Sequence, residues 1–309
     1  MTEEGRDDST NRSNDRKRAW YKNHGVYVAT SFKYYGKDDQ MWMGSYKPSG
    51  SSGILKIGTL NVTEGGKLWL HGYDGSEKSD IYIGAGGINI SGSGYVGIEN
   101  ERHTQTLWPW DSDYTISGGT NADYDLLLRD TGHKFVLNLQ TKDEGGVPRT
   151  VTLNGRISTN GDSTKTINVL GTGTNVVAVA QPLMAGTYAV VDTATLSLKA
   201  GVGFLNGTLS LGAGTTLSLA SNIDRTLTPP AATIALPSTG MATIRIDGRQ
   251  RLTAGDHILG EVTGLQDGVD INNVLTVTGT AVGDRPTLRV ENGSIILNVR
   301  PIPFKVIVR

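Results

Sequence analysis

Apolar and polar residues alternate along most of this chain in short runs. From about residue 54 onward, alternating runs of four to six residues are separated by glycine-containing corners, as in ATLSLKAGVGFLNGTLSLGAGTTLSLA at 194–220. A period of two built from Leu, Val, Ile and Thr is typical of β-strands, and no window shows helical spacing behind an N-cap. The pattern predicts an all-β protein whose core includes Leu209, Leu211, Leu217 and Leu219.

The corners between the runs help to choose among β architectures. Short strands with repeated Gly-x-Gly corners and many Thr, Asn and Ser are typical of a parallel β-helix, or β-solenoid, in which coils stack and their inward residues form one column. Asn-Gly pairs, which favour tight hairpins, occur at 154–155, 206–207 and 292–293. We therefore predict a β-solenoid, with a β-sandwich as the alternative.

Charged, aromatic and proline residues divide the chain into four predicted segments. Residues 1–30 form a flexible, charged N-terminal segment, because their composition buries too little apolar surface to fold. Residues 31–220 form the β-solenoid, whose N-terminal half holds most of the aromatic residues. Residues 221–240 form a connection containing Pro229 and Pro230, which cannot donate to a sheet. Residues 241–309 form a C-terminal β region that caps or extends the solenoid.

Composition argues against several classes of function. The 29 Lys and Arg residues balance 30 Asp and Glu residues, so the chain lacks the net positive charge that attracts nucleic acid, and we expect no nucleic-acid binding. The chain has no Cys, which excludes disulfide scaffolds, thiolate zinc sites and Cys nucleophiles. Its five His residues lack metal-binding spacing, so we expect no metal and no cofactor. The sequence contains no run of eighteen apolar residues, so we expect no transmembrane segment. Residues 1–18 lack the pattern of a secretory signal.

Several sequence segments resemble one family of bacterial surface proteins. GINISGSGYVGIEN, TINVLGTGTNVV, TLSLGAGTTLSLASN and DRPTLRVENGSIILNV are similar to the passenger regions of Gram-negative autotransporters and to autotransporter-associated β-strand repeats, over about residues 54–300. The resemblance implies a right-handed β-helix, export to the cell surface, and adhesion or scaffolding. Because we find neither a signal nor a membrane-barrel region after the repeats, the chain looks like an excised passenger, or one anchored through a missing flanking region.

The most unusual segment places aromatic rings and carboxylates around a proline. Sugars stack their CH faces on aromatic rings and direct their hydroxyls at carboxylates, so this segment is a candidate ligand patch. Its candidate residues are Trp108, Trp110, Asp111, Asp113 and Tyr114. A second candidate set shares one strand face at period two: Trp69, His71 and Tyr73. The alternative, favoured by the usual burial of large aromatic residues, is that these rings fill the core.

Other motifs match known sites without the context those sites need. The GxGxxG match at 92–97 is not followed by helical periodicity, so a dinucleotide site is not expected. The LPxTG match at 236–240 is followed by strand-like sequence and is interpreted as a proline turn. GxSxG is absent, and the region around Asp74 and Asp80 lacks the repeating nonapeptide of calcium-binding loops.

We therefore predict an exported module of the bacterial surface that is structural or adhesive, non-catalytic, and able to bind host or matrix glycans or proteins. The alternative is a carbohydrate-active β-helix enzyme, a polysaccharide lyase or glycoside hydrolase. Its charged groups would come from Glu99, Glu101, Arg102, Asp111 and Asp113. A third option is a phage fibre or tailspike segment. Two buried carboxylates in a cleft near Trp110 would favour the enzyme, whereas a flat face lined by Thr and Asn would favour adhesion.

Overall fold

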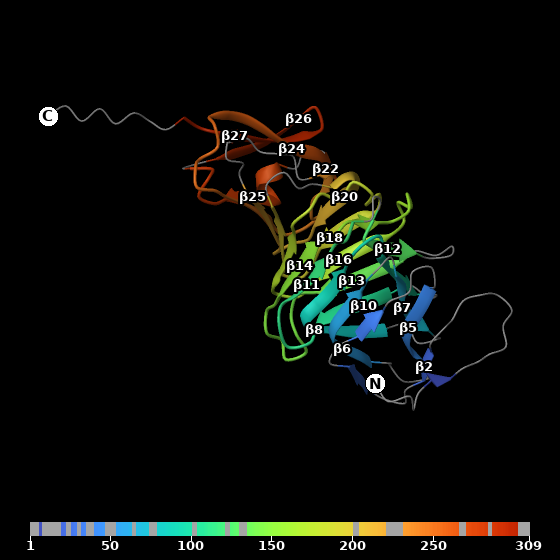
Figure 1. Ribbon diagram of the computed structural model, residues 1–309. Helices are drawn as coiled ribbons and strands as arrows, with labels where there is room; N and C mark the ends of the chain where they lie inside the picture. The colour runs from blue at the N-terminus through green and yellow to red at the C-terminus, as the bar shows by residue number, and fades with distance from the viewer. Residues whose placement is uncertain are drawn as a thin grey trace.

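The computed structural model is an elongated all-β molecule in which strands stack from the N-terminal end (blue) to the C-terminal end (red) (Figure 1). The one helix among the described residues is the three-residue 3-10 turn η1 (Ile271–Asn273), too short to span a membrane. The structure describes residues 6–7, 20–22, 26–29, 32–34, 40–46, 54–63, 66–73, 79–100, 104–120, 124–129, 135–199, 204–220, 231–265, 270–283 and 286–301.

Most strands form two rows in which each strand pairs in parallel with the strand two or three places further along the chain. The first row contains β10 (Thr104–Pro109), β13 (Val136–Gln140), β16 (Thr166–Leu170), β18 (Thr187–Val190), β20 (Phe204–Leu211), β22 (Ala231–Ala235) and β24 (Gly255–Thr263). The second row contains β11 (Tyr114–Ser117), β14 (Thr150–Asn154), β17 (Thr174–Val177), β19 (Thr195–Leu198), β21 (Thr216–Ala220), β23 (Ala242–Asp247) and β25 (Leu275–Thr278).

The two rows belong to one sheet because long strands join them. The first half of β8 (Ser79–Ile90) pairs with β10 and its second half pairs with β11. β8 also pairs with β6 (Ile54–Val62), whose two halves pair with β3 (Val26–Ala29) and β4 (Phe32–Tyr34). At the C-terminal end, β27 (Ser294–Val299) pairs antiparallel with β24 and with β26 (Thr287–Glu291), so the sheet is mixed.

A second sheet lies beside the first. It contains β1 (Arg6–Asp7), β2 (Trp20–Lys22), β5 (Gln40–Tyr46), β7 (Lys67–Tyr73), β9 (Tyr95–Asn100), β12 (Leu126–Arg129) and β15 (Ile157–Ser158), in that order. All of its pairs are parallel except β1 with β2.

The predicted fold class is wrong beyond its all-β content. The structure has one large mixed sheet, mostly parallel, that curves into a nearly closed barrel, and is not the predicted right-handed β-helix. The sequence pattern treated glycines as corners between separate short strands, whereas β8 continues through Gly84, Gly86 and Gly87 and joins both rows. The β-sandwich alternative fails as well, because sandwiches are built from antiparallel sheets and these pairs are mostly parallel.

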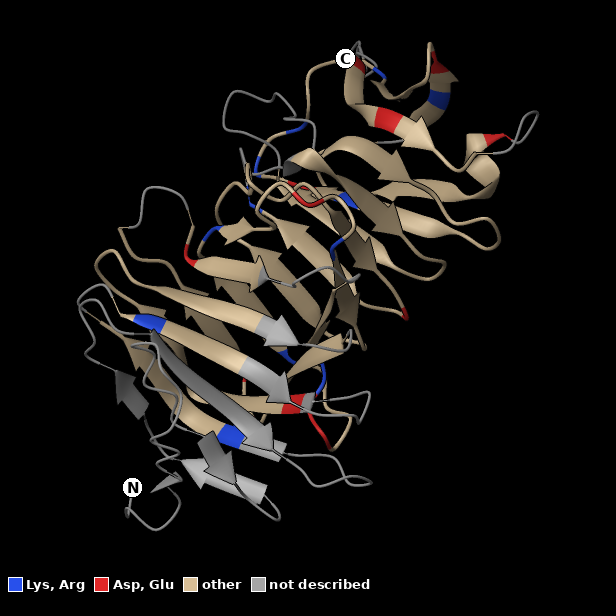
Figure 2. Ribbon diagram, turned by 90° about the vertical axis from the view of Figure 1, so that its right-hand side faces the viewer, with Lys and Arg blue, Asp and Glu red and all other residues tan. Residues whose placement is uncertain are grey.

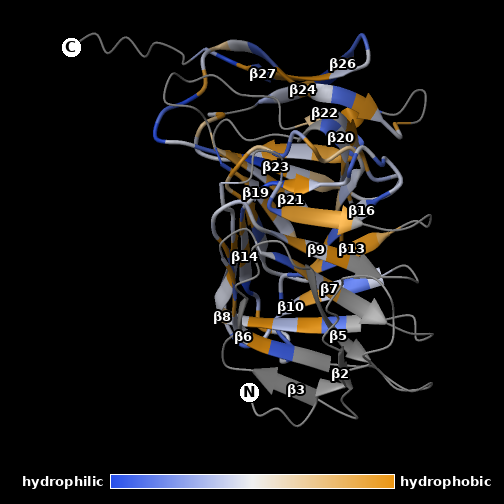
Figure 3. Ribbon diagram, turned by 45° about the vertical axis from the view of Figure 1, so that its right-hand side comes forward, coloured by the Kyte–Doolittle hydropathy of each residue, from blue (hydrophilic) through white to orange (hydrophobic). Residues whose placement is uncertain are grey.

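The core follows the alternation of the sequence. In β16, for example, Ile167 and Val169 are buried while their neighbours are half-buried. The four leucines predicted for the core, Leu209, Leu211, Leu217 and Leu219, are all buried, which confirms that prediction. The inward side chains form one continuous cluster along the molecule, and the apolar stripes of the strands are visible in Figure 3.

Two features bear on the predicted segments. β22 lies within the connection predicted at 221–240 and pairs with both β20 and β24, while residues 221–230, including Pro229 and Pro230, lie outside the described residues. The central strands carry few charged residues, as Figure 2 shows by their tan colour.

Candidate functional site

The strand register brings three residues from separate strands together on the outer face of the large sheet. Lys56 of β6 pairs with Tyr82 of β8, and Tyr82 pairs with Trp108 of β10. Trp110 lies on the same face, two residues after Trp108, and its backbone nitrogen donates to the Ile83 carbonyl oxygen at 2.9 Å. We call Lys56, Tyr82, Trp108 and Trp110 the aromatic patch.

Contacts within the aromatic patch hold Trp108 in place. The Trp108 and Tyr82 rings stack with centroids 5.8 Å apart and an interplanar angle of 15°. The Trp108 Nε1 atom donates to Asp80 Oδ1 at 3.1 Å. Trp108 and Trp110 are half-buried, so part of each indole is open to solvent. The indoles therefore lie on the sheet surface and not in the core.

Lys56 contacts two aromatic rings of the patch. Its Nζ atom lies 4.8 Å from the Tyr82 ring centroid and 5.7 Å from the Trp110 ring centroid, both within cation–π range. The same atom is 3.3 Å from Glu144 Oε2. Burial and, to a smaller extent, the negative charges of Asp80 and Glu144 together raise the pKa of Tyr82 to about 12. Tyr82 is therefore a neutral hydrogen-bonding group over a wide pH range.

The remaining candidates of this segment have separate positions. Asp111 is exposed and accepts a hydrogen bond from Ser112 Oγ at 3.1 Å. Asp113 is exposed, and its Oδ1 accepts from the Thr150 backbone nitrogen at 2.7 Å, so it fastens the start of β14. Tyr114 faces the core, where burial raises its pKa, and its hydroxyl has no hydrogen-bond partner among the described residues. Tyr114 is therefore not available to a surface ligand.

Trp69 lies in a second aromatic cluster on the outer face of the second sheet. Its ring is fully buried and meets Tyr95 edge-on at 5.7 Å, and Tyr95 meets Tyr124 at 5.3 Å. Leu127 completes the group, and we call these four residues the Trp69 cluster. Because Trp69 has no exposed surface, it packs here and does not form a platform for sugars. His71 and Tyr73 lie on β7, but their side chains are outside the described residues.

The outer faces also carry two ladders of threonine that sequence reasoning did not single out. In the second row, each threonine pairs with the next: Thr150, Thr174, Thr195, Thr216, Thr243 and Thr276. In the first row, the paired threonines are Thr166, Thr187, Thr208 and Thr233. All ten are half-buried. The signal that could have found them is the recurrent Thr at the start of each apolar run.

Sequence reasoning also missed Lys56 and Tyr82, which lie far from Trp108 in the sequence. Each is a polar or aromatic residue between two aliphatic residues of its strand, and this alternation was the available signal. It could not show that these positions pair with Trp108, because that depends on the register between strands. A further site, around Tyr124, was missed for the same reason.

The other motifs have structural roles in the described part of the chain. The GxGxxG match at 92–97 covers the turn after β8 and the first residues of β9, so a strand and not a helix follows the turn. Asp80 binds the Trp108 indole. Asp74, Glu101 and Arg102, and the side chain of Glu99, lie outside the described residues. No group of three metal-ligating side chains occurs among those that the structure describes.

Comparison with known proteins gives no relative. No family model, curated protein or solved structure matches this chain. The resemblance to autotransporter passengers therefore stays a prediction, and the functional argument rests on the geometry of this chain alone.

Proposed function

We propose that this chain is an exported module of the bacterial surface, structural or adhesive, that binds carbohydrate at the aromatic patch and catalyses no reaction. The observation that carries the proposal is the register of Lys56, Tyr82 and Trp108 across three strands, with Trp110 beside them. Such a row presents partly open indole surface on a rigid sheet, and a rigid platform lowers the entropic cost of binding.

The chemistry of the aromatic patch suits a polyhydroxylated ligand. Apolar CH faces of a sugar can stack on the half-buried indoles, and carboxylates accept hydrogen bonds from its hydroxyls. Asp111 is exposed beside Trp110, and Glu144 lies at the Lys56 ammonium. Because the face is shallow, affinity per site is expected in the micromolar to millimolar range, with avidity supplied by many copies on a cell.

Two observations support adhesion over a carbohydrate-active enzyme. Asp111 and Asp113 are exposed, and Asp113 is engaged by the Thr150 backbone, whereas a glycosidase needs two carboxylates across the scissile bond. The threonine ladders supply the extended face of hydroxyl groups that adhesion favours, and Asn89 extends the polar face by donating to Asn61 Oδ1 at 3.1 Å. A repeating polar face can contact an extended polymer at several points.

The test of the aromatic patch is a glycan array probed with wild type, Trp110→Ala and Trp110→Phe. Trp110→Ala should lose binding while keeping its circular dichroism spectrum, because the platform loses its contact area without the ring. Trp110→Phe keeps a ring and should retain part of the binding. If Trp110→Ala unfolds, or binds the same glycans as wild type, the aromatic patch is not the binding site.

The enzyme alternative is tested separately. Wild type and Asp111→Asn are incubated with polysaccharides, and released reducing ends and unsaturated products are measured. Neither protein should release products. Turnover by wild type that is lost in Asp111→Asn would contradict the proposal that the chain is non-catalytic.

A further inference from the structure

A pocket lies where the second sheet stops. β15 is the last strand of that sheet among the described residues. Residues 182–185, which take the next place in the stack, have no regular strand structure. The resulting depression has a volume of about 330 Å³ and is lined by Tyr124, Ser158, Asn160, Gly161, Pro182, Leu183, Ala185 and Asn206. This volume is at the lower end of the range for small-molecule sites, roughly 300–1,000 Å³.

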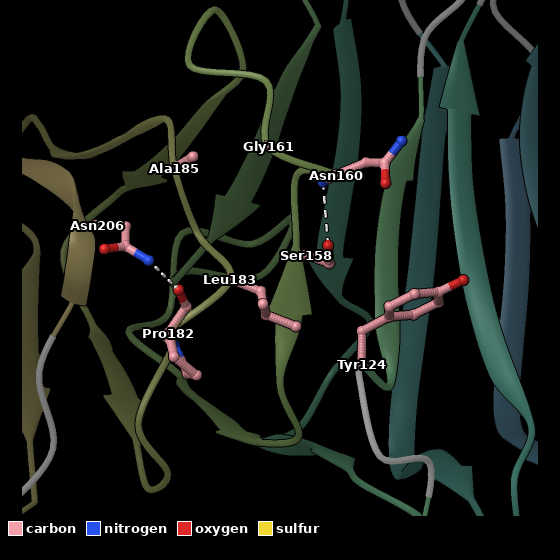
Figure 4. A pocket seen from close by; sticks show the side chains of 8 residues that line it. All are labelled: Tyr124, Ser158, Asn160, Gly161, Pro182, Leu183, Ala185 and Asn206. Atoms are coloured by element: carbon pink, nitrogen blue, oxygen red, sulfur yellow. Dashed lines mark hydrogen bonds between the residues drawn. The ribbon is translucent and has the colours of Figure 1, made fainter.

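Successive passes of the chain build this pocket. Figure 4 shows Asn206 hydrogen-bonded to the Pro182 carbonyl on one side and Tyr124 on the other, and this hydrogen bond is 2.7 Å long. Ser158 accepts a hydrogen bond from the Asn160 backbone nitrogen at 3.0 Å, which leaves its hydroxyl proton free to be donated. The lining is thus fixed by contacts among its own residues.

The chemistry of the lining is neutral and amphipathic. It contains one phenol ring, two carboxamides and one aliphatic hydroxyl, and no charged side chain. The Leu183 side chain is 38% exposed, although leucine residues are usually buried in the core. An aromatic and aliphatic floor with a few carboxamides and hydroxyls complements a ligand that has an apolar ring face and several hydroxyls.

We propose that this pocket binds a neutral saccharide unit, with the sugar against Tyr124 and Leu183 and its hydroxyls directed at Asn160 and Asn206. The site lies at the end of the second sheet and shares no residue with the aromatic patch, so it goes beyond the function proposed above and does not depend on it. A hexose unit has few atoms and the pocket is shallow, so the dissociation constants are expected to be millimolar.

Asn160 allows a sharp test because its backbone conformation is one that glycine also adopts. Asn160 has φ 54° and is followed by Gly161 with φ 76°, so both residues lie in the left-handed region. Asn160→Gly therefore removes the carboxamide and keeps the turn. The matched control is Asn292→Gly, because Asn292 (φ 49°) precedes Gly293 (φ 78°) in an equivalent turn outside the pocket.

The experiment is saturation-transfer NMR with methyl glucoside, methyl galactoside and N-acetylglucosamine as probes, and with glucuronate and glucosamine as charged comparisons. Wild type and Asn292→Gly should bind at least one neutral probe, and more tightly than either charged sugar. Asn160→Gly should bind that probe several-fold more weakly. Tyr124→Ala should lose binding at least tenfold, whereas Tyr124→Phe, which keeps the ring, should retain it.

Several results would overturn the proposal: no signal from any neutral probe at millimolar concentration, or equal binding by wild type and Asn160→Gly. If Tyr124→Ala fails to fold, the comparison of Asn160→Gly with Asn292→Gly decides the question by itself. Because the aromatic patch is also proposed to bind sugars, these variants are compared in the Trp110→Ala background, so failure at either site is read independently of the other.

Discussion

The Oε1 atom of Gln181 accepts a hydrogen bond from the backbone nitrogen of Ile157 at 2.7 Å. The Nε2 atom of the same side chain donates to the carbonyl oxygens of Gly155, at 3.0 Å, and Val179, at 3.1 Å. Ile157 begins β15, the last described strand of the second sheet, so the Gln181 carboxamide occupies the place where a further strand would bond. Gln181 is fully buried, and its polar atoms are thereby satisfied.

Gln181→Leu should lower the free energy of unfolding, because it leaves buried backbone groups without partners at about 1–3 kcal/mol each. Gln181→Glu should also destabilise at neutral pH, since its oxygens face the Gly155 and Val179 carbonyl oxygens. Urea denaturation measures both variants, with Val147→Ala, a change at an exposed residue, as the control. Wild-type stability in Gln181→Leu would show that water satisfies the end of this sheet.

Gly97→Ala should destabilise the protein by about 1–3 kcal/mol through overpacking. A Cβ atom at Gly97 would lie 2.1 Å from the Trp69 ring, which covers this position on the neighbouring strand. Gly145→Ala is the matched control, since its Cβ would meet only Asp143 Oδ1, at 3.3 Å. Trp69→Leu in the Gly97→Ala background should recover part of the loss, and thermal unfolding of wild type, Gly97→Ala, Trp69→Leu and the double variant measures it. Additive effects of the two changes would rule out this steric explanation.

Leu217→Asp should lower the free energy of unfolding by several kcal/mol, because an unpaired carboxylate in an apolar core is heavily penalised. Leu217 is fully buried and pairs with Leu196 and Ile244 on the neighbouring strands. Thr216→Asp, one residue away on the outer face, is the control and should cost much less. Chemical denaturation compares the two variants. Equal losses would mean that the strand does not distinguish its faces as described.

Stability should decrease at alkaline pH, in part through Tyr82. Burial raises its pKa from 10.0 to about 12, so the folded chain holds the proton more tightly than the unfolded chain does. The contribution of Tyr82 to the free energy of unfolding is complete below pH 10 and is lost as the pH rises through about 12. Urea denaturation across this range should show a shallower decline for Tyr82→Phe, because the buried Tyr114 and Tyr188 still contribute in the same direction. An identical slope in both proteins would contradict the assignment to Tyr82.

The alternation of residues was enough to predict strands and their buried faces. Leu209, Leu211, Leu217 and Leu219 are inside because a strand places every second residue on one side, and this period is local. The sheet that contains them was predicted wrongly. Glycine is compatible both with corners and with extended backbone, so the run at 84–87 could not reveal that β8 continues through it and joins two rows into one sheet.

For the candidate site, the sequence located Trp108, Trp110 and Asp111 on the chain, and their chemistry made a carbohydrate ligand the natural hypothesis. Only the tertiary structure decided that Trp108 and Trp110 lie on the outer face with Lys56 and Tyr82, and that Tyr114 and Trp69 are buried. The physical reason is that side-chain type and period are properties of a single strand. Register, and the point at which a sheet stops, are set by hydrogen bonds and packing between strands far apart in the sequence.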